Sequence, residues 1–153
     1  MASLKIYTDG GCSGNPGPGG WAYIIVLETF QGDKILGQKL GAEQNTTNNR
    51  MELSAVIAAL RALKALEGVP RTVAVYTDSQ YVQKGITEWI RNWKRNSWRT
   101  SDKKPVKNQD LWMDLDTLAE EFSLIWEWVP GHAGVAYNEQ CDRMTQEAIR
   151  SFT

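Results

Sequence analysis

The sequence predicts an α/β domain built on one five-stranded mixed sheet, with three antiparallel strands followed by two parallel ones and helices flanking them. Three strand-like segments fill the first 45 residues, and the loops between them are short enough for antiparallel neighbours. Two later strand-like segments alternate with helical ones, a pattern typical of parallel strands joined by helical crossovers. The 153 residues, 42% hydrophobic and 23% charged, fit a single globular domain over residues 1–153.

The first three strands are indicated by segments rich in β-branched and aromatic residues. Lys5–Thr8, Trp21–Glu28 and Lys34–Leu40 have this composition. Gly, Pro and Asn cluster over Gly10–Gly20, between the first two segments, and Gln31–Asp33 separates the second from the third. We therefore expect two antiparallel connections, the first through a glycine-rich loop.

A long helix follows, and the later elements alternate between helix and strand. Apolar residues recur at 3.6-residue spacing from Leu53 to Leu66. This spacing predicts a helix over Asn48–Glu67, which Gly68 and Pro70 stop. The other predicted elements are a strand Thr72–Thr77, a short helix Ser79–Lys84 ended by Gly85, a helix Thr87–Asn96 capped by Thr87, a helix Asn108–Phe122, a strand Leu124–Val129 and a last helix Ala136–Arg150.

The net charge of −1 hides a strong asymmetry along the chain. Eight basic residues and two acidic ones lie between Lys84 and Lys107, so this segment carries a charge of +6 and the remainder −7. Such a distribution within one domain indicates a basic patch that meets a polyanion, on an otherwise acidic body.

Membrane and targeting segments are not expected. The longest apolar run, Trp21–Leu27, is far shorter than the roughly 18 residues of a membrane helix. The N-terminus passes directly into strand-like sequence without an apolar signal segment. Two cysteines, Cys12 and Cys141, are too few for a disulfide framework. We therefore expect a cytoplasmic protein in a reducing environment, acting as a monomer.

Four acidic residues stand where a sheet of this kind places its ligands. Asp9 directly follows the first predicted strand and Asp78 the fourth, and both emerge at one carboxyl edge if these strands are parallel neighbours. Glu52 lies one turn into the long helix beside its apolar stripe, and Asp142 lies in the first half of the last helix. Each acid alone has a simpler explanation as a turn or cap residue, as in Asp78-Ser79.

Carboxylates that lie close together need a positive charge nearby to offset their mutual repulsion. Within about 4–6 Å they repel each other and raise one another's pKa values, whereas Mg²⁺ removes this cost and prefers oxygen ligands. Two such ions about 3.5–4 Å apart activate a water molecule and stabilise the leaving oxygen of a phosphodiester. The four acids therefore predict a two-metal hydrolytic site if the fold brings them together.

Five segments, in this order along the chain, resemble bacterial ribonuclease H of type 1. They are Thr8–Gly20, Thr46–Leu53, Thr77–Val82, Trp126–Gly134 and Asn138–Asp142. The resemblance covers nearly the whole chain and implies the ribonuclease H-like fold. It also implies an endonuclease that cleaves the RNA strand of an RNA–DNA hybrid, leaves 5′-phosphate and 3′-hydroxyl ends, and serves the removal of RNA primers and R-loops.

The family's functional residues carry over onto matching positions. The resemblance implies two Mg²⁺ ions, for which Mn²⁺ can substitute, and their implied ligands are Asp9, Glu52, Asp78 and Asp142. The implied contacts with the hybrid substrate are Gly10, Cys12, Asn15, Thr47, Asn48, Asn49, Gln80, Trp89, Trp93, Lys94, Arg95, Trp98, Arg99 and Lys104.

His132, the only histidine, is a further catalytic candidate. A lone histidine is more often a packing or surface residue. Here it lies between two glycines near a carboxylate-bearing helix, and an ordinary pKa near 6.5 suits a mobile proton carrier. The resemblance implies that it assists proton transfer or product release.

Amide side chains are candidates for distinguishing RNA from DNA. Asn15, Asn48, Asn49 and Gln80 can reach 2′-hydroxyl groups and minor-groove base edges. The alternative is local turn chemistry, because Asn15 precedes Pro16 in a strong turn signal and Asn48 is a plausible helix cap.

Tryptophans interleave with cations in the basic segment. Trp89, Trp93 and Trp98 lie among basic residues, so aromatic faces can pack on deoxyribose or bases while the cations contact phosphates. In the family this segment grips the DNA strand. The alternative is an amphipathic helix whose tryptophans reach the core.

Other site and function classes fit the sequence less well. Cys12, Cys141 and His132 are a poor zinc set because they lack CxxC spacing, so reduced thiols are expected. A non-catalytic RNA–DNA hybrid-binding module is disfavoured by the intact set of four acids. Another nuclease of the same fold, such as an exonuclease or integrase core, is disfavoured by the basic tryptophan segment.

Overall fold

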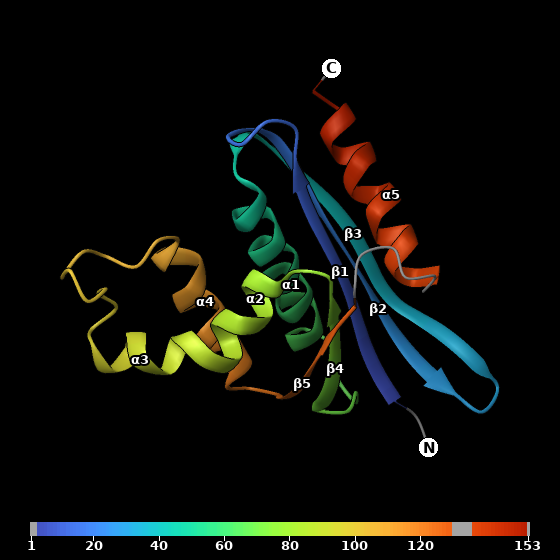
Figure 1. Ribbon diagram of the computed structural model, residues 1–153. Helices are drawn as coiled ribbons and strands as arrows, with labels where there is room; N and C mark the ends of the chain where they lie inside the picture. Colours follow the sequence, from blue (N-terminus) through green and yellow to red (C-terminus); the bar gives the residue numbers. More distant parts are fainter. Residues whose placement is uncertain (1–2, 130–135, 153) are drawn as a thin grey trace.

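A single mixed sheet organises the molecule (Figure 1). The computed structural model describes residues 3–129 and 136–152, and the strands in these ranges are β1 (Ser3–Cys12), β2 (Gly17–Thr29), β3 (Gly32–Thr46), β4 (Thr72–Thr77) and β5 (Ser123–Trp128). They form a five-stranded sheet in the order β3-β2-β1-β4-β5. β2 is antiparallel to both β1 and β3, whereas β4 is parallel to both β1 and β5. The predicted fold class is therefore confirmed.

Helices cover both faces of the sheet. α1 (Asn48–Lys64) packs on one face and α5 (Ala136–Arg150) on the other (Figure 1). Successive strand residues point to opposite faces: Ile6 of β1 belongs to the apolar cluster under α1, and the next residue, Tyr7, to the cluster under α5. β1 is therefore held between the two helices, each of which carries one of the predicted acids.

The remaining helices lie on the same side of the sheet as α1 (Figure 1). They are α2 (Gln80–Lys84), a π-helical turn η1 (Gly85–Trp89), α3 (Ile90–Arg95) and α4 (Gln109–Ala119). In the described residues, no helix has the length and apolar character that a membrane crossing requires.

The predicted helix break at Gly85 is wrong. The chain stays helical from α2 through η1 into α3, and a Cβ at Gly85 would overlap the indole ring of Trp112. Gly85 thus permits close packing of α4 instead of ending a helix. Thr87 does not cap a helix either, because it lies inside this run and its hydroxyl donates to the Gln83 carbonyl at 2.7 Å.

The glycine-rich segment is largely strand, although a loop was expected there. Gly10–Cys12 belongs to β1 and Gly17–Gly20 to β2, and Gly11 pairs with Gly20 across the two strands. A Cβ at Gly20 would lie 2.8 Å from the Ala148 Cβ of α5. Gly20 is therefore a position where α5 approaches the sheet backbone directly.

Most of the other boundaries differ from the predicted ones by a few residues at one or both ends. β3 runs past the predicted end at Leu40 to Thr46, because its polar residues pair with the glycine-rich part of β2, Glu43 with Gly19. α1 ends at Lys64, before the predicted stop. β4 and α5 have the predicted bounds.

Candidate active site

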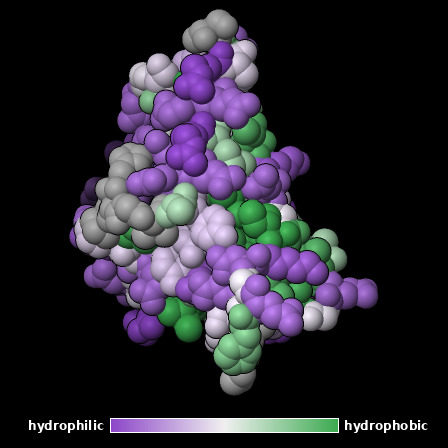
Figure 2. All heavy atoms as spheres, turned by 90° about the vertical axis from the view of Figure 1, so that its right-hand side faces the viewer, coloured by the Kyte–Doolittle hydropathy of each residue, from purple (hydrophilic) through white to green (hydrophobic). Residues whose placement is uncertain are grey.

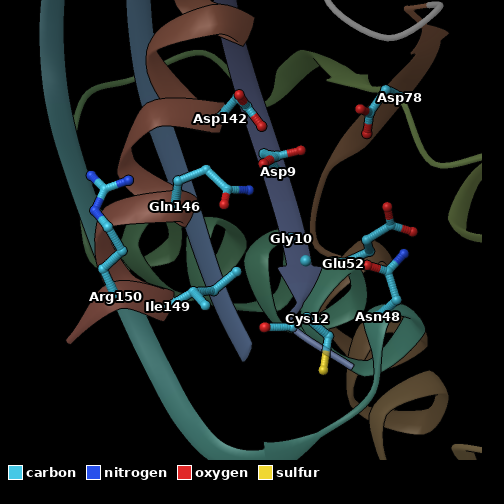
Figure 3. Close-up of a pocket in the computed structure, with 12 residues that line it drawn as sticks. Asp9, Gly10, Cys12, Asn48, Glu52, Asp78, Asp142, Gln146, Ile149 and Arg150 are labelled. Carbon is cyan, nitrogen blue, oxygen red and sulfur yellow. The ribbon is translucent and has the colours of Figure 1, made fainter. Parts of the chain in front are cut away.

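Four carboxylates from different parts of the chain line one open pocket at the edge of the sheet (Figure 3). Asp9 stands on β1 and Asp78 directly follows β4, and the parallel pairing of these strands brings both to one edge. Glu52 projects from α1 and Asp142 from α5. The pocket has a volume of about 590 Å³. All four predicted metal ligands therefore share one pocket.

Close contacts at two glycines set the positions of two of these acids. Gly10 follows Asp9, and a Cβ at Gly10 would overlap the backbone of Met51 and Glu52 in α1. The α1 backbone therefore touches β1, which brings Glu52 to the pocket. Gly20 does the same for α5 on the other face. A side chain at either glycine would push a helix and its carboxylate away from the sheet.

The pKa of Asp9 is strongly raised. Its pKa is raised to about 8, mainly by burial and then by the neighbouring charges of Asp78, Asp142 and Glu52. The Thr145 hydroxyl of α5 opposes this rise by favouring the charged carboxylate. That hydroxyl is fully buried and makes no hydrogen bond within 3.5 Å to any described residue, so it acts on Asp9 as a nearby dipole.

Glu52 is perturbed in the same direction. Burial, followed by the negative charge of Asp78, raises the pKa of Glu52 to about 7, while the Ser79 hydroxyl lowers it. Two carboxyl groups in one pocket are thus held well above their ordinary range. Burial and the neighbouring negative charges therefore disfavour the charged forms of Asp9 and Glu52.

The donor set suits Mg²⁺, a hard cation that prefers oxygen ligands. Within residues 3–129 and 136–152, no three His, Cys, Asp or Glu side chains are grouped closely enough to enclose an ion. Mg²⁺ is usually bound by one or two carboxylates together with waters and substrate phosphate oxygens. An open pocket with its carboxylates spread around it fits that mode of binding, and a cation there would bring the raised pKa values of Asp9 and Glu52 down.

The predicted substrate contacts around the pocket divide into two groups. Those that line it are Gly10, Cys12 and Asn48. Thr47 and Asn15 instead hold the start of α1. The Thr47 hydroxyl accepts from the Arg50 N–H at 3.3 Å, and the Asn15 side-chain oxygen accepts from the Asn48 N–H at 3.1 Å. The helix cap is therefore Thr47, and the suggestion that Asn48 caps the helix is wrong.

Two further predicted substrate contacts lie outside this lining, and one predicted catalytic residue is not among the described residues. Asn49, on α1, and Gln80, exposed at the start of α2, are outside the pocket lining that the described residues define. His132 lies outside the described residues.

Sequence reasoning missed part of the pocket lining. Ser13, which follows β1, also lines the pocket, and Gln146, Ile149 and Arg150 of α5 form a wall (Figure 3). Gln146 and Arg150 lie four and eight residues after Asp142, the spacing of one helix face. That spacing was the available signal.

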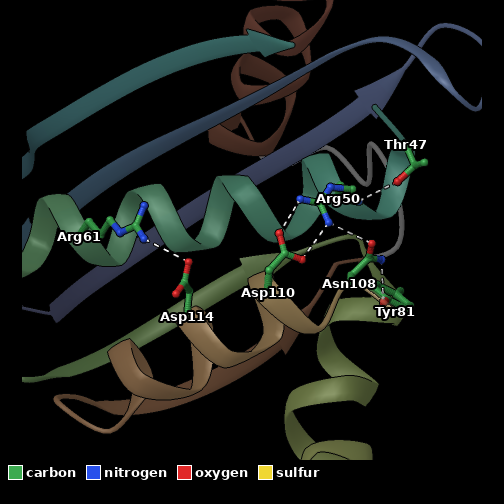
Figure 4. Close-up of polar contacts among 7 residues, drawn as sticks. All are labelled: Thr47, Arg50, Arg61, Tyr81, Asn108, Asp110 and Asp114. Carbon is green, nitrogen blue, oxygen red and sulfur yellow. Dashed lines mark hydrogen bonds and ion pairs between the residues drawn. The ribbon is translucent and has the colours of Figure 1, made fainter. Parts of the chain in front are cut away.

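A polar network ties the start of α1 to α2 and α4 (Figure 4). The Arg50 guanidinium donates to both carboxylate oxygens of Asp110 at 3.0 and 2.8 Å and to the Asn108 side-chain oxygen at 3.3 Å. The Asn108 amide and the Trp112 indole N–H both donate to the Tyr81 hydroxyl, at 3.1 and 2.9 Å. The pocket-lining turn of α1 is thereby connected to the helices that precede and follow the basic segment.

The tryptophans of the basic segment (residues 84–107) pack largely on one another. The ring centroid of Trp93 lies 5.9 Å from Trp89, 6.4 Å from Trp98 and 5.4 Å from Trp112 of α4. Trp93 thus reaches the core, as the amphipathic alternative expected. Trp89 remains 36% exposed and keeps surface for a ligand.

The cations of this segment are exposed but not equivalent. Arg95, Arg99 and Lys104 are solvent-exposed. The Lys94 ammonium lies 3.1 Å from Asp116 of α4 and 3.5 Å from Glu120, the residue that follows this helix. Lys94 is therefore already paired with acids of the protein, and a substrate phosphate would have to compete with them for its ammonium group.

Both cysteines are free thiols, and each forms hydrogen bonds with different backbone carbonyls. Cys12 donates to the carbonyls of Gly17 and Thr46, both at 3.3 Å, and Cys141 is buried and donates to the Tyr7 carbonyl at 3.4 Å. Burial raises the pKa of the Cys141 thiol, which disfavours the thiolate that zinc requires.

Comparison with known proteins agrees with this architecture. A family model described as RNase H matches residues 1–150. A ribonuclease H of Cupriavidus pinatubonensis is 52% identical over 152 residues, which cover 99% of each chain. LC9-RNase H1, a type 1 RNase H with the type 2 active-site motif, superimposes with a TM-score of 0.85 at 31% identity over 98% of this chain and 73% of its own. LC11-RNase H1, solved in complex with an RNA/DNA hybrid, has a TM-score of 0.71 at 25% identity over 98% of this chain and 99% of its own. This chain belongs to the RNase H family, in its type 1 branch.

Proposed function

We propose that this ribonuclease H hydrolyses the RNA strand of RNA–DNA hybrids as an endonuclease, with two Mg²⁺ ions held by the carboxylates of its pocket. The observation that carries the proposal is the convergence of Asp9, Glu52, Asp78 and Asp142 on one open pocket. Four carboxylates that line one pocket suit a reaction on a phosphodiester, because metal ions held by them would balance its negative charge during cleavage.

The carboxylates supply the scaffold for the metal ions. Asp9, at the centre of the electrostatic cluster, is the candidate ligand to both, and the other three acids complete the coordination. When bound, the ions lower the pKa of the attacking water and stabilise the leaving oxygen. The chain itself then needs no strong base in the pocket. Products with 5′-phosphate and 3′-hydroxyl ends follow from displacement of the 3′ oxygen, and Mn²⁺ can replace Mg²⁺ at such oxygen sites.

Discrimination of RNA from DNA falls to the polar lining beside the acids. Asn48 and the backbone of Gly10–Cys12 line the pocket and can reach a 2′-hydroxyl group of the strand being cut. Asn15 and Thr47 hold Asn48 and the first turn of α1 in place. Asn49 and Gln80 lie near this region in the sequence, and we assign them to contacts with neighbouring bases in the minor groove of the hybrid.

His132 is assigned to proton transfer or product release. It lies in the segment that joins β5 to α5, and α5 carries Asp142. An imidazole with an ordinary pKa near 6.5 exchanges protons readily at neutral pH. We expect the residue to affect turnover more than substrate affinity.

The basic segment is assigned to the DNA strand. Arg95, Arg99 and Lys104 supply exposed positive charge, and Trp89 and Trp98 supply aromatic surface, with Trp93 as their packing support. Phosphate contacts of this kind give affinity without sequence preference. The segment thus positions the hybrid while the acid pocket performs the cleavage.

The cellular setting is also part of the proposal. A single domain over residues 1–153, active as a monomer in the cytoplasm, would remove RNA primers and R-loops. The two free thiols agree with a reducing compartment.

The decisive experiment compares four substrates side by side. Labelled RNA–DNA hybrid, RNA–RNA duplex, DNA–DNA duplex and single-stranded RNA are incubated with the protein in Mg²⁺ and in EDTA. We expect Mg²⁺-dependent internal cleavage of the RNA in the hybrid alone. Binding without cleavage would indicate a hybrid-binding module, and cleavage of duplex DNA would indicate another nuclease of this fold.

A further inference from the structure

The acid pocket continues along α5 beyond Asp142. Gln146 and Arg150 line it together with Asp142 at successive turns of one helix face (Figure 3). The eight-residue step from Asp142 to Arg150 spans about 12 Å along the helix axis. The lining therefore continues from the carboxylates along α5 to Arg150, whose guanidinium lies on the side of the helix away from Asp9 and Glu52 in Figure 3.

Arg150 carries the only positive charge among the described residues that line this pocket. An RNA strand has a phosphate at every nucleotide, so a strand cleaved at the acids must place neighbouring phosphates along the same pocket. Carboxylates repel these phosphates, whereas a guanidinium binds one through two parallel hydrogen bonds.

We propose that Arg150, with Gln146 beside it, forms a subsite for a backbone phosphate of the RNA strand adjacent to the scissile one. The proposal rests on the proposed function, because it presumes that the RNA strand enters the acid pocket. The subsite is distinct from the basic segment, which lies beyond α1 on the other side of the sheet (Figure 1). The hybrid is thus held by cations on both sides of the acids.

The exposed side of α5 provides an internal control. Hydrophilic side chains gather over this helix on the face that Figure 2 shows. Arg143 and Arg150, both on α5, are exposed. Both border a second depression on α5, but only Arg150 also lines the acid pocket. Arg143→Ala therefore removes the same charge from the same helix without touching the proposed subsite.

Arg150 also has a structural explanation that the test must separate. It lies in the last turn of α5, where a cation interacts favourably with the helix dipole. A purely structural role would lower the melting temperature of Arg150→Ala and leave hybrid affinity unchanged. Arg150→Lys keeps the charge at the helix end but loses the bidentate geometry.

The experiment measures hybrid affinity of the full chain in EDTA over a range of salt concentrations, and kcat and KM in Mg²⁺. For Arg150→Ala we expect affinity to fall about 5- to 10-fold at low salt, with the slope of log K against log salt smaller by about one. KM rises more than kcat falls. Arg150→Lys gives an intermediate loss, and Arg143→Ala matches the wild type.

A second arm locates the phosphate. Hybrids carry one neutral methylphosphonate linkage at successive positions of the RNA strand near the cleavage site. At one position the loss of affinity seen with the wild type should disappear in Arg150→Ala, because the two changes remove the same contact.

Two results would overturn the subsite. One is an Arg150→Ala variant whose affinity and salt slope equal those of Arg143→Ala, and the other is additive loss at every linkage. A lowered melting temperature with unchanged affinity would likewise leave Arg150 as a structural residue. Failure of the proposed function is a separate result, namely no Mg²⁺-dependent cleavage of the hybrid by the wild-type protein.

Discussion

The acid pocket and the basic segment both concentrate charge of one sign, but the fold builds them in opposite ways. The pocket draws its acids from β1, α1, the end of β4 and α5, and the carboxyl groups of Asp9 and Glu52 are largely removed from water. The basic segment draws its cations from one contiguous stretch, residues 84–107, and exposes most of them.

This difference decides how far each region depends on packing. Exposed charges are screened by water and salt, so their spacing tolerates change. Buried like charges interact strongly and keep their relation only if the backbone holds them. In this molecule Gly10 and Gly20 provide that hold, because they allow α1 and α5 to touch the sheet on its two faces.

The largest effect is expected from removing one charge in the pocket. Asp9→Asn should lower kcat on the hybrid by about a thousandfold or more, because the candidate ligand to both metals is lost. Hybrid binding should be kept or strengthened, since repulsion between the acids and the phosphates falls. Cleavage assays and binding in EDTA measure both.

Asp114→Asn is the matched control for this change. Asp114 is an exposed acid of α4 paired with Arg61 at 3.3 Å, away from the pocket. The Asp114→Asn variant should retain wild-type activity. Activity retained in Asp9→Asn would remove the acid pocket from catalysis and leave no contrast between the two regions.

The next effect concerns stability without metal. The pKa of Asp9 rises from an ordinary 3.8 to about 8, so the folded protein binds a proton there more tightly than the unfolded chain does. Stability in EDTA should therefore fall as the pH rises from about 4 to 8, by an amount on the order of 3 to 5 kcal/mol. Glu52 adds to the fall in the lower part of this window, up to its pKa of about 7.

Urea unfolding in EDTA at pH 5 and pH 8 tests this expectation. Asp9→Asn should flatten the dependence, and Mg²⁺ should restore stability at pH 8 by binding the folded state. A free energy of unfolding that is constant or rises over this range would show that the pKa values of Asp9 and Glu52 are not raised in the folded protein.

Removing cations from the basic segment should have a smaller and different effect. Replacing Lys94, Arg95 and Arg99 by Ala should raise KM about tenfold or more and flatten its salt dependence, with kcat nearly unchanged. Lys94→Ala alone should contribute least, because Asp116 already pairs with its ammonium. An unchanged salt slope in the triple variant would refute the assignment to the DNA strand.

The smallest effect is expected where the two regions are joined. Arg50→Ala removes the bidentate contact with Asp110, which is partly exposed, so about 1 kcal/mol of stability should be lost. The start of α1 should then be held less firmly, with a modest loss in kcat. Arg61→Ala, which breaks an exposed pair farther along α1, should change neither quantity by as much.

The spacing of apolar residues, together with the Gly, Pro and Asn residues that separate the segments, was enough to predict the order of the strands and helices. β4 and α5 were predicted with their bounds, because a short buried strand and an amphipathic helix each have a strong local pattern. The glycine positions were misread. Gly85 does not stop a helix and Gly10–Cys12 is not a loop, because in each case a packed neighbour decides the conformation.

The sequence by itself determined the identity of the four acids, the order of the motifs around them and the basic character of residues 84–107. These are properties of residue type and spacing, which need no coordinates. The tertiary structure alone decided that Arg150 and Gln146 share the pocket with the acids, that Lys94 is paired with Asp116, and that Asp9 and Glu52 are buried enough to shift their pKa values. Each of these depends on distances between segments far apart in the chain, and burial and Coulomb interactions are set by those distances.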